Sequence, residues 1–430
     1  MFPLLLNARV AQPCGRATGA RLLVFLLLLW PVIGSAQSTL SLDQAMRLAV
    51  ERAPMLDARR AQVEAARQDW RRSGRLPDPM LMVGIDDLPA SGSDAFDPTA
   101  DAMTMKRIGI RQDLPARAER AARRSLAART IDEAQAVGQA EALAIRRSAA
   151  EAWIGLWATQ QELDELIALR EQTDLASRLA QARVAGGTDP AADALAAEAA
   201  VLELENRIES ARAAHTAAQA GLARWIGTDL SGVTAETPDF SHLPISEAQL
   251  QASLDRLGPL LPITARLETT AAAVDLARAE RRPDWSVAAS YGERNGGGSG
   301  MLMLEVAIQL PLFTGNRQDR DVAARQADYQ AALASREAVR REQMAAIRGQ
   351  VARWESLKRQ VEREESALLP LLRDRSATAL AAYRAGAPVR PWLDARGDEL
   401  QALIEHARRT GELGRTWAAL AFLLPPEVEQ

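Results

Sequence analysis

Six of the ten methionines lie in three short stretches of the chain, and their spacing is its clearest sign of chemistry. In each stretch a single residue separates two methionines, which would put both side chains on one face of a β-strand. These residues are Met80, Met82, Met103, Met105, Met301 and Met303. Thioether sulfur is a soft ligand that suits Cu(I) and Ag(I), so a surface lined by these residues could pass such ions. Methionine is also a flexible apolar filler, and this plainer interpretation stays open.

Other residue types that usually carry chemistry are scarce. The chain has one cysteine, Cys14, and three histidines, His215, His242 and His406, which stand far apart in the sequence. It has no G-x-S-x-G motif, so we expect no catalytic residue, no enzyme activity and no cofactor. The glycine-rich segment 295–300 lacks the spacing of a phosphate-binding loop and precedes no helix. A formal net charge of −4 excludes a strongly basic nucleic-acid-binding protein.

Four segments alternate between apolar and polar residues, as strands with two different faces do. The predicted strands cover residues 80–88, 103–113, 284–292 and 301–311. In the last of them Leu302 and Leu304 oppose Met303 and Glu305, so the methionines fall on the polar face. Strands of about nine to eleven residues with this alternation are typical of a membrane β-barrel. A half-buried sheet on a soluble domain is the alternative.

Four strands are too few to close such a barrel, because closure needs about eight or more. An open sheet would leave unpaired backbone groups in hydrocarbon, which lipid does not tolerate. Two, three or four chains must therefore pool their strands. The connections 86–101 and 293–300 would then form the outer loops.

The remaining residues predict long helices. They cover residues 43–73, 117–185, 190–226, 246–281, 317–385 and 391–424. Ser41 is a suitable N-cap for the first helix, and Pro370 should kink the fifth. Residues 117–185 contain no proline, and at 1.5 Å per residue they make a rod of roughly 100 Å. In each half of the chain two shorter helices together match one long helix, so we expect them to stack end to end along it.

The first 36 residues predict a cleaved export signal. Three arginines and no acidic residue precede an apolar run at 22–33, and small residues at 34–36 mark the cleavage site. Cleavage would remove Cys14 and leave a mature chain without cysteine, which suits a bacterial periplasm or envelope.

Three motifs recur about 200 residues apart in the same order, so the mature chain reads as two copies of one unit. The matching segments are 75–79 with 281–285, 112–115 with 309–312, and 183–186 with 383–386. The predicted division is a signal at 1–36, a first repeat at 37–228, a linker at 229–245, a second repeat at 246–424 and a tail at 425–430.

Several motifs make the mature chain similar to the TolC-type outer-membrane factors, the outer-membrane channels of tripartite efflux pumps. The motifs are Ser-Leu-Asp-Gln-Ala at 41–45 with Ala-Pro at 53–54, Leu-Pro-Asp-Pro at 76–79, Gln-Leu-Pro-Leu-Phe at 309–313, Tyr-Arg-Ala-Gly at 383–386, and Leu-Asp-Ala at 393–395. The resemblance covers residues 40–424 and implies a homotrimer, in which twelve strands close one membrane β-barrel on a tunnel of long helical hairpins. It also implies two partners, a periplasmic adaptor (membrane fusion protein) and an inner-membrane RND pump. Segments 77–88 and 103–115 most resemble the heavy-metal branch, the CzcC-like and CusC-like channels.

For the periplasmic tip the resemblance implies a gate formed by the turns 185–190 and 385–391. The implied gate and selectivity residues are Asp394, Tyr383, Asp189 and Asp193, and the implied adaptor contacts are Gly186, Gly187 and Gly386. In a trimer Asp394 would form an acidic ring that favours cations. Asp394 could instead only stabilise the start of its helix. The chain departs from the family at Pro388, Arg390 and Pro391, which leaves the partner of Tyr383 open.

The expected fold class is therefore mainly α with a small β part. The expected function is a passive, gated exit duct in the outer membrane of a Gram-negative bacterium, with lipid around its strands and its helical tunnel in the periplasm. Heavy-metal cations are the expected cargo, and drugs or other small molecules are the alternative. A soluble periplasmic coiled-coil scaffold is the rival from another class of protein.

Overall fold

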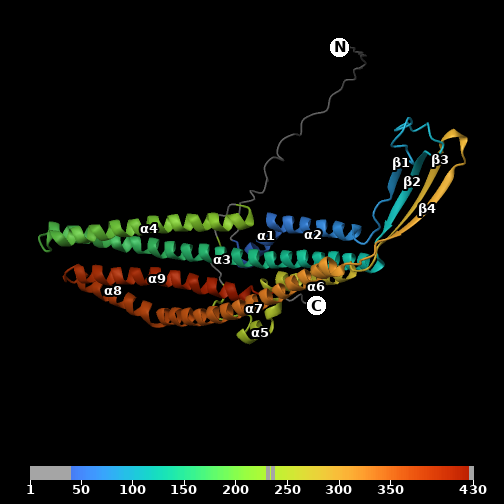
Figure 1. The fold of residues 1–430 in the computed structure, drawn as a ribbon. Helices are drawn as coiled ribbons and strands as arrows, with labels where there is room; N and C mark the ends of the chain where they lie inside the picture. The colour runs from blue at the N-terminus through green and yellow to red at the C-terminus, as the bar shows by residue number, and fades with distance from the viewer. Residues whose placement is uncertain (1–39, 229–232, 234–237, 426–430) are drawn as a thin grey trace, which may run out of the picture. The chain divides into compact units, whose positions relative to one another are not determined.

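The computed structural model describes residues 40–228, 233 and 238–425 (Figure 1). The predicted export signal, the linker positions 229–232 and 234–237 and the tail positions 426–430 lie outside the described residues. Long helices and one small sheet make up the described part, which confirms the mainly α fold class with a small β part.

Four helices flank the first pair of strands. They are α1 (Leu42–Glu51), α2 (Pro54–Arg72), α3 (Arg117–Ala185) and α4 (Ala191–Ile226). The Ser41 hydroxyl accepts from the Gln44 amide while the Gln44 side chain accepts from the Ser41 amide, so Ser41 caps α1 as predicted. The single helix predicted over 43–73 is wrong, because Pro54 has no N–H to continue α1 and instead starts α2.

Five helices form the second half of the described chain. They are α5 (Glu247–Ala252), α6 (Leu260–Ala279), α7 (Gln318–Arg363), α8 (Leu369–Arg384) and α9 (Arg390–Ala421). The helix predicted over 246–281 is broken by a 3₁₀ turn, Leu254–Arg256, followed by Pro259. The predicted interruption at Pro370 takes the form of a π-helical turn, Glu364–Leu368, because the proline cannot donate to the preceding turn.

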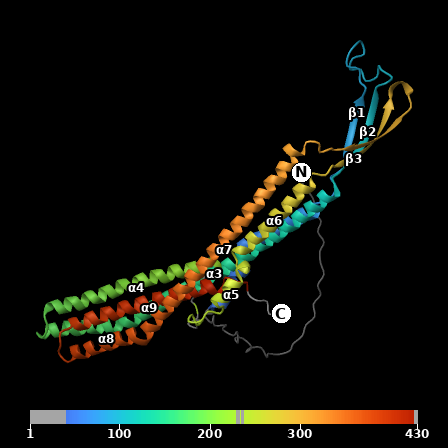
Figure 2. The ribbon, with the colours of Figure 1, turned by 60° about the horizontal axis from the view of Figure 1, so that its bottom comes forward.

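These helices form a wall with α3 at its centre (Figures 1 and 2). In Figure 1, α2 and α4 lie end to end along one side of α3, while α6 and α9 lie end to end along the other side, and all four contact α3. Helix α7 packs on α6 and α9, and α8 packs on α9. The stacking of two shorter helices along one long helix is therefore as predicted.

The main core lies where α1, α3, α4 and α9 meet. Trp153, Ile154, Leu222 and Ala418 are fully buried there. The Trp153 indole nitrogen donates to the Leu40 carbonyl at 2.7 Å, so the one polar atom of this side chain is paired in the core. This packing holds the start of α1 against the middle of α3.

The sheet has four antiparallel strands in the order β1-β2-β3-β4. They are β1 (Met80–Asp86), β2 (Met105–Leu114), β3 (Trp285–Arg294) and β4 (Met301–Ile308). The strand predicted to 88 ends at Asp86, because Asp87 has a φ of 54°, which a strand cannot continue. The strand predicted to 311 ends at Ile308, shortly before Pro311. In Figure 1 the strands lie beyond the ends of α2, α3, α6 and α7.

Candidate functional site

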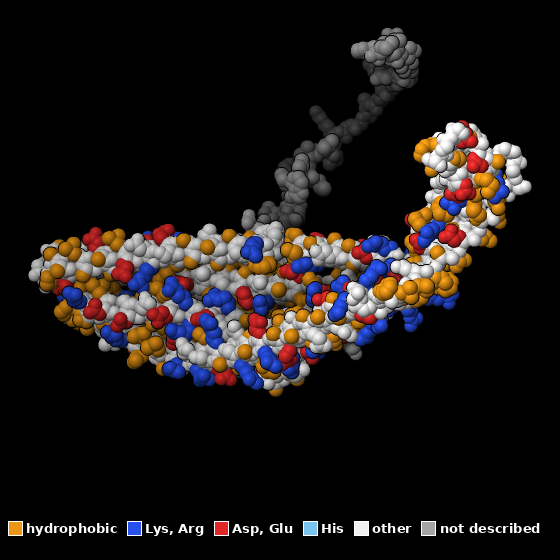
Figure 3. Space-filling model, viewed as in Figure 1, with side chains coloured by type: hydrophobic (Ala, Val, Ile, Leu, Met, Phe, Trp, Pro, Cys, Tyr) orange, Lys and Arg blue, Asp and Glu red, His pale blue; other side chains and the backbone are white. Residues whose placement is uncertain are grey.

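One face of the sheet carries large apolar side chains that no other described part of the chain covers (Figure 3). Leu304 is 77% exposed and Val83 is 75% exposed. The other exposed members of this face are Leu81, Ile85, Ile108, Ile110, Trp285, Val287, Tyr291, Leu302, Val306 and Ile308. Apolar surface gains about 25 cal/mol for each Å² removed from water. A continuous exposed face of this kind therefore marks contact with lipid or with another protein.

The opposite face of the sheet is polar. Arg107 pairs with Asp86 at 3.1 Å across β1 and β2, and Arg111 pairs with Asp113 at 3.2 Å along β2. Glu305 shares this face. The two faces thus differ largely as those of a barrel wall do, although the register also puts Lys106, Glu293 and Gln112 on the apolar side.

Five of the six methionines lie on this polar face. Met82 and Met303 share one row of the register, with Gly109 and Ser290 between them. Met105 fills the space over Gly292, where a Cβ added to the glycine would clash with the methionine sulfur. Met80 and Met301 lie on the same face, in the two rows on either side of the row that contains Met82 and Met303.

The prediction that Met103 lies on a strand is wrong. Strand β2 begins at Met105, and the Met103 amide donates to the Asp101 carboxylate at 2.7 Å, which holds Met103 in the preceding turn. A side chain in this turn has no fixed place in the strand register.

The sheet is open at both edges. Among the described residues β1 pairs only with β2, and β4 pairs only with β3. Each edge strand therefore presents a row of backbone N–H and C=O groups without strand partners. If lipid covers the apolar face, these groups need strands from further chains.

At the far end of the helices one arginine joins the two helical turns. Arg183 near the end of α3 donates through Nη1 to the Tyr383 carbonyl at 2.7 Å. Its Nη2 donates to the Gly386 carbonyl at 3.2 Å and to Asp189 Oδ1 at 2.8 Å. The α3–α4 turn and the α8–α9 turn are thus linked through one guanidinium, whose planar donors suit several acceptors at once.

Tyr383 is fully buried beneath this arginine. The Arg183 guanidinium carbon lies 4.9 Å from the centre of the Tyr383 ring, which is a cation–π contact. Burial raises the pKa of the Tyr383 hydroxyl, Arg183 opposes that rise, and Asp189 and Asp193 add to it. The hydroxyl has no hydrogen-bond partner among the described residues, and neither does Asp189 Oδ2. The sequence left the partner of Tyr383 open. In the structure Arg183 contacts this residue through the backbone carbonyl and the ring, and not through the hydroxyl.

Comparison with known proteins fits this geometry. A sequence profile of the outer membrane efflux protein family matches residues 250–424. No curated protein sequence matches the chain. The solved CmeC outer membrane channel of Campylobacter jejuni aligns with a TM-score of 0.74 at 12% identity, over 90% of this chain and 86% of that one. The chain has the fold of an outer membrane efflux channel.

Other solved structures agree with this fold. A membrane protein from Pseudomonas aeruginosa aligns with a TM-score of 0.76 at 18% identity, over 89% of both chains. The CusC channel aligns with a TM-score of 0.76 at 14% identity, over 89% of this chain and 92% of that one. At these identities the likeness concerns the fold.

The remaining predicted tip residues lie near the Arg183 link but differ in their surroundings. Asp193 is half-buried in the first turn of α4, whereas Asp394 is exposed in the second turn of α9. Gly187 and Gly386 have φ angles of 73° and 107°, which favour glycine, while Gly186 has an ordinary helical φ of −78°. The backbone therefore requires glycine at two of the three predicted adaptor-contact positions.

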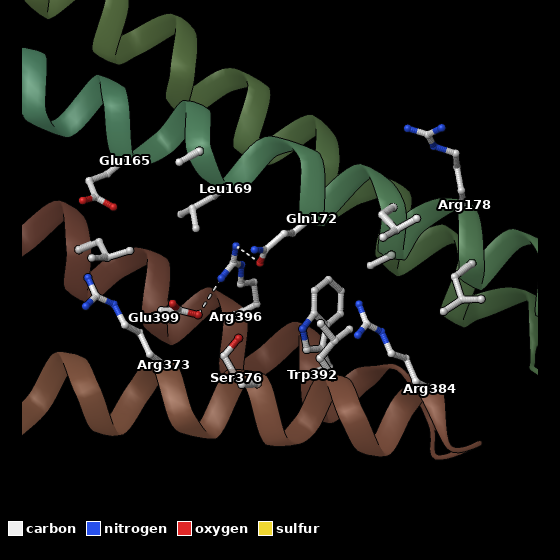
Figure 4. A pocket seen from close by; sticks show the side chains of 17 residues that line it. Glu165, Leu169, Gln172, Arg178, Arg373, Ser376, Arg384, Trp392, Arg396 and Glu399 are labelled. Atoms are coloured by element: carbon white, nitrogen blue, oxygen red, sulfur yellow. Dashed lines mark hydrogen bonds and ion pairs between the residues drawn. The ribbon is translucent and has the colours of Figure 1, made fainter.

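A groove of about 920 Å³ lies between α3 and the α8–α9 hairpin (Figure 4). Arg396 crosses it, donating to Glu399 at 2.8 Å and to Gln172 at 3.0 Å, and Trp392 and Leu169 line its apolar part. Neither here nor elsewhere in the described chain do three or more His, Cys, Asp or Glu side chains lie where they could hold a metal ion. Within the same residues no helix is long and apolar enough to cross a membrane.

Proposed function

We propose that this chain is one protomer of a passive exit duct of the outer membrane, in which the sheet crosses the lipid and the helices form a tunnel in the periplasm. The observation that carries the proposal is the sheet, which has an exposed apolar face, a charged opposite face and two edges that no other described strand pairs with. A soluble scaffold would have to cover that apolar face with protein, and no other described part of the chain does so. The match to the outer membrane efflux protein family and the shared fold support the same location.

We infer that three copies close the duct, giving twelve strands and one tunnel. The free edges of β1 and β4 can then pair around a ring, which satisfies all their backbone groups. A homotrimer would also place three copies of each tip side by side. The proposed partners at the tip are a periplasmic adaptor and, through it, an inner-membrane RND pump, with Gly186, Gly187 and Gly386 at the adaptor contact.

The tip is the proposed gate. Arg183 ties the α8–α9 turn to the α3–α4 turn, so opening requires these contacts to break or shift. Exposed Asp394, in three copies, would form an acidic ring at the entrance, and Asp193 would add negative charge to it. Asp189 is paired with Arg183, so its proposed role in the gate is to hold the link between the two turns. Charged rings of this kind select ions by sign, and this one would favour cations.

Heavy-metal cations are the proposed cargo. Met80, Met82, Met105, Met301 and Met303 lie on the polar face of the sheet, which would line the lumen. Thioether sulfur is a soft ligand that suits Cu(I) and Ag(I). CusC is only one of several channels that share the fold, so the shared fold does not identify the cargo. The proposal of a metal cargo therefore depends on these methionines.

A tolerance panel tests this function. A deletion strain and its complemented partner would be grown with copper, silver, zinc, cobalt, cadmium and several hydrophobic drugs. A second complementing variant would have all six methionines changed to leucine. If the deletion strain is sensitive to copper and silver and this variant fails to restore tolerance, the result would support the metal duct. Rescue by that variant would remove the methionines from the proposal. Sensitivity to drugs alone would assign the duct to small-molecule export.

A further inference from the structure

The four places where the chain passes between helices and sheet are unusually rich in arginine. Residues 71–79, 115–124, 278–284 and 312–320 hold twelve arginines and five acidic residues, in a chain whose net charge is −4. The four crossings therefore carry more positive than negative charge, although the whole chain does not. Figure 3 shows blue side chains where the strands leave the helices, as well as along the helices.

These four crossings lie side by side. An added Cβ on Gly74 would lie 2.6 Å from the Arg120 carbonyl, so the first two crossings touch. Arg123 lies 3.6 Å from Glu280, which joins the second to the third. Arg281 pairs with Asp319 at 3.1 Å, which joins the third to the fourth. The positive residues thus form one continuous band across the protomer.

At least half of the twelve arginines at the four crossings are not neutralised by an acidic side chain of the described chain. Six exposed arginines there make no ion pair with any described residue, namely Arg71, Arg75, Arg117, Arg282, Arg317 and Arg320. We call these six residues the arginine band. An unpaired cationic band is costly to keep free of counterions, so it is a ready site for anions.

The arginine band adjoins exposed apolar side chains. Phe313 is 80% exposed and Leu312 75% exposed, and Leu76 and Leu310 are exposed as well. They continue the apolar face of the sheet towards the helices, with Trp285 at the start of β3 between them. Apolar side chains and tryptophan beside a row of cations are what a membrane surface binds, with the chains in the acyl region and the cations at the headgroups.

We infer that the arginine band binds the headgroups of anionic phospholipids in the membrane leaflet that faces the helices. The inference rests on the proposed function, because it needs the sheet to lie in a bilayer. Arginine suits this partner, since its planar guanidinium forms paired hydrogen bonds to phosphate oxygens. All twelve basic residues of the four crossings are arginine. The bound lipid would fix the depth of the sheet in the bilayer and hold the four crossings at the membrane surface.

The test uses the full chain reconstituted in phosphatidylcholine bilayers with and without phosphatidylglycerol. The lipids that stay bound after detergent extraction would be counted by mass spectrometry. We expect phosphatidylglycerol to be enriched about fivefold or more over its bulk share, since one basic side chain near an anionic surface contributes about that factor. High salt should reduce the enrichment, because it screens the attraction.

Changing one arginine at each crossing should abolish the enrichment. This variant carries Arg71→Gln, Arg117→Gln, Arg282→Gln and Arg317→Gln. The control carries the same change at four exposed arginines elsewhere on the helices that also make no ion pair with described residues, namely Arg256, Arg348, Arg363 and Arg415, and it should keep the enrichment. If the fourfold variant does not insert, the single variants Arg117→Gln and Arg317→Gln should each show a partial loss.

Equal lipid counts for the parent and the fourfold variant, or an equal loss in the control, would overturn the inference. Insertion into phosphatidylcholine alone separates the two proposals. If the parent inserts there but shows no preference for phosphatidylglycerol, only the lipid site fails. If the parent enters no bilayer, the proposed duct fails with it.

Discussion

At the scale of single residues, Arg183 determines how the two tip turns are joined. Replacing it with alanine removes the donors to two carbonyls and leaves the Asp189 carboxylate, whose side chain is 5% exposed, without a cation. Losing one partner of such a buried pair costs about 3 kcal/mol. We expect Arg183→Ala to make the closed tip leaky, seen as a higher single-channel conductance in planar bilayers. Arg178→Ala, an exposed change on the same helix, is the control, and equal conductance in both variants would contradict the link.

The Tyr383 hydroxyl and the Tyr383 ring should contribute differently to stability and to the closed tip. The hydroxyl is buried and has no hydrogen-bond partner within the described part of the chain, and such a group costs about 1–3 kcal/mol. Tyr383→Phe should therefore raise the unfolding temperature slightly or leave it unchanged, and conductance should stay at the parental level. Tyr383→Ala should instead cost about 3–5 kcal/mol because it empties a packed site. A leaky Tyr383→Phe channel would mean that the hydroxyl, and not the ring and backbone carbonyl, holds the gate.

The sequence motifs indicated Tyr383 but not Arg183. The contact between them joins residues 200 positions apart, so no local spacing reveals it. The only signal was that 183–186 and 383–386 occupy matching places in the two repeats, which suggests that the two turns lie at the same level. Which side chain reaches across depends on packing that periodicity does not describe.

At the scale of elements, the sheet offers a matched pair of substitutions on adjacent residues. Leu304 lies on the apolar face and Glu305 on the charged face of β4. An arginine facing lipid near the bilayer centre costs about 2–4 kcal/mol, whereas one facing water costs little. We expect Leu304→Arg to reduce the amount of assembled channel in outer-membrane fractions and Glu305→Arg to leave it near the parental amount. Equal yields would mean that Leu304 does not face lipid.

Element boundaries were predictable where one residue type sets them. The long helix was predicted over 117–185 and spans Arg117–Ala185, because Pro115 precedes it and two glycines follow it. Prolines inside a helical pattern were harder to interpret. Pro54 starts a new helix, whereas Pro370 follows a π-helical turn. A proline removes one N–H donor in both places, and the different outcomes depend on packing that the local pattern does not describe.

Considered as a whole molecule, one chain forms only part of the wall of the proposed duct. Among the described residues the sheet has two free edges and an exposed apolar face. Such a sheet is not stable in lipid by itself, so the proposed duct needs several copies of the chain. The alternation of the strands and their small number already predicted this from the sequence. The number of copies followed only from the resemblance to known channels, because strand count alone allows two, three or four.

The mass of the intact assembly shows whether several chains form one unit. The full chain would be extracted from the outer membrane in mild detergent and weighed by native mass spectrometry, before and after heating. We predict an assembly of three chains that heating converts to single chains. A single chain of stable mass before heating would contradict the assembled duct, and release of that chain from cells without detergent would favour a soluble scaffold.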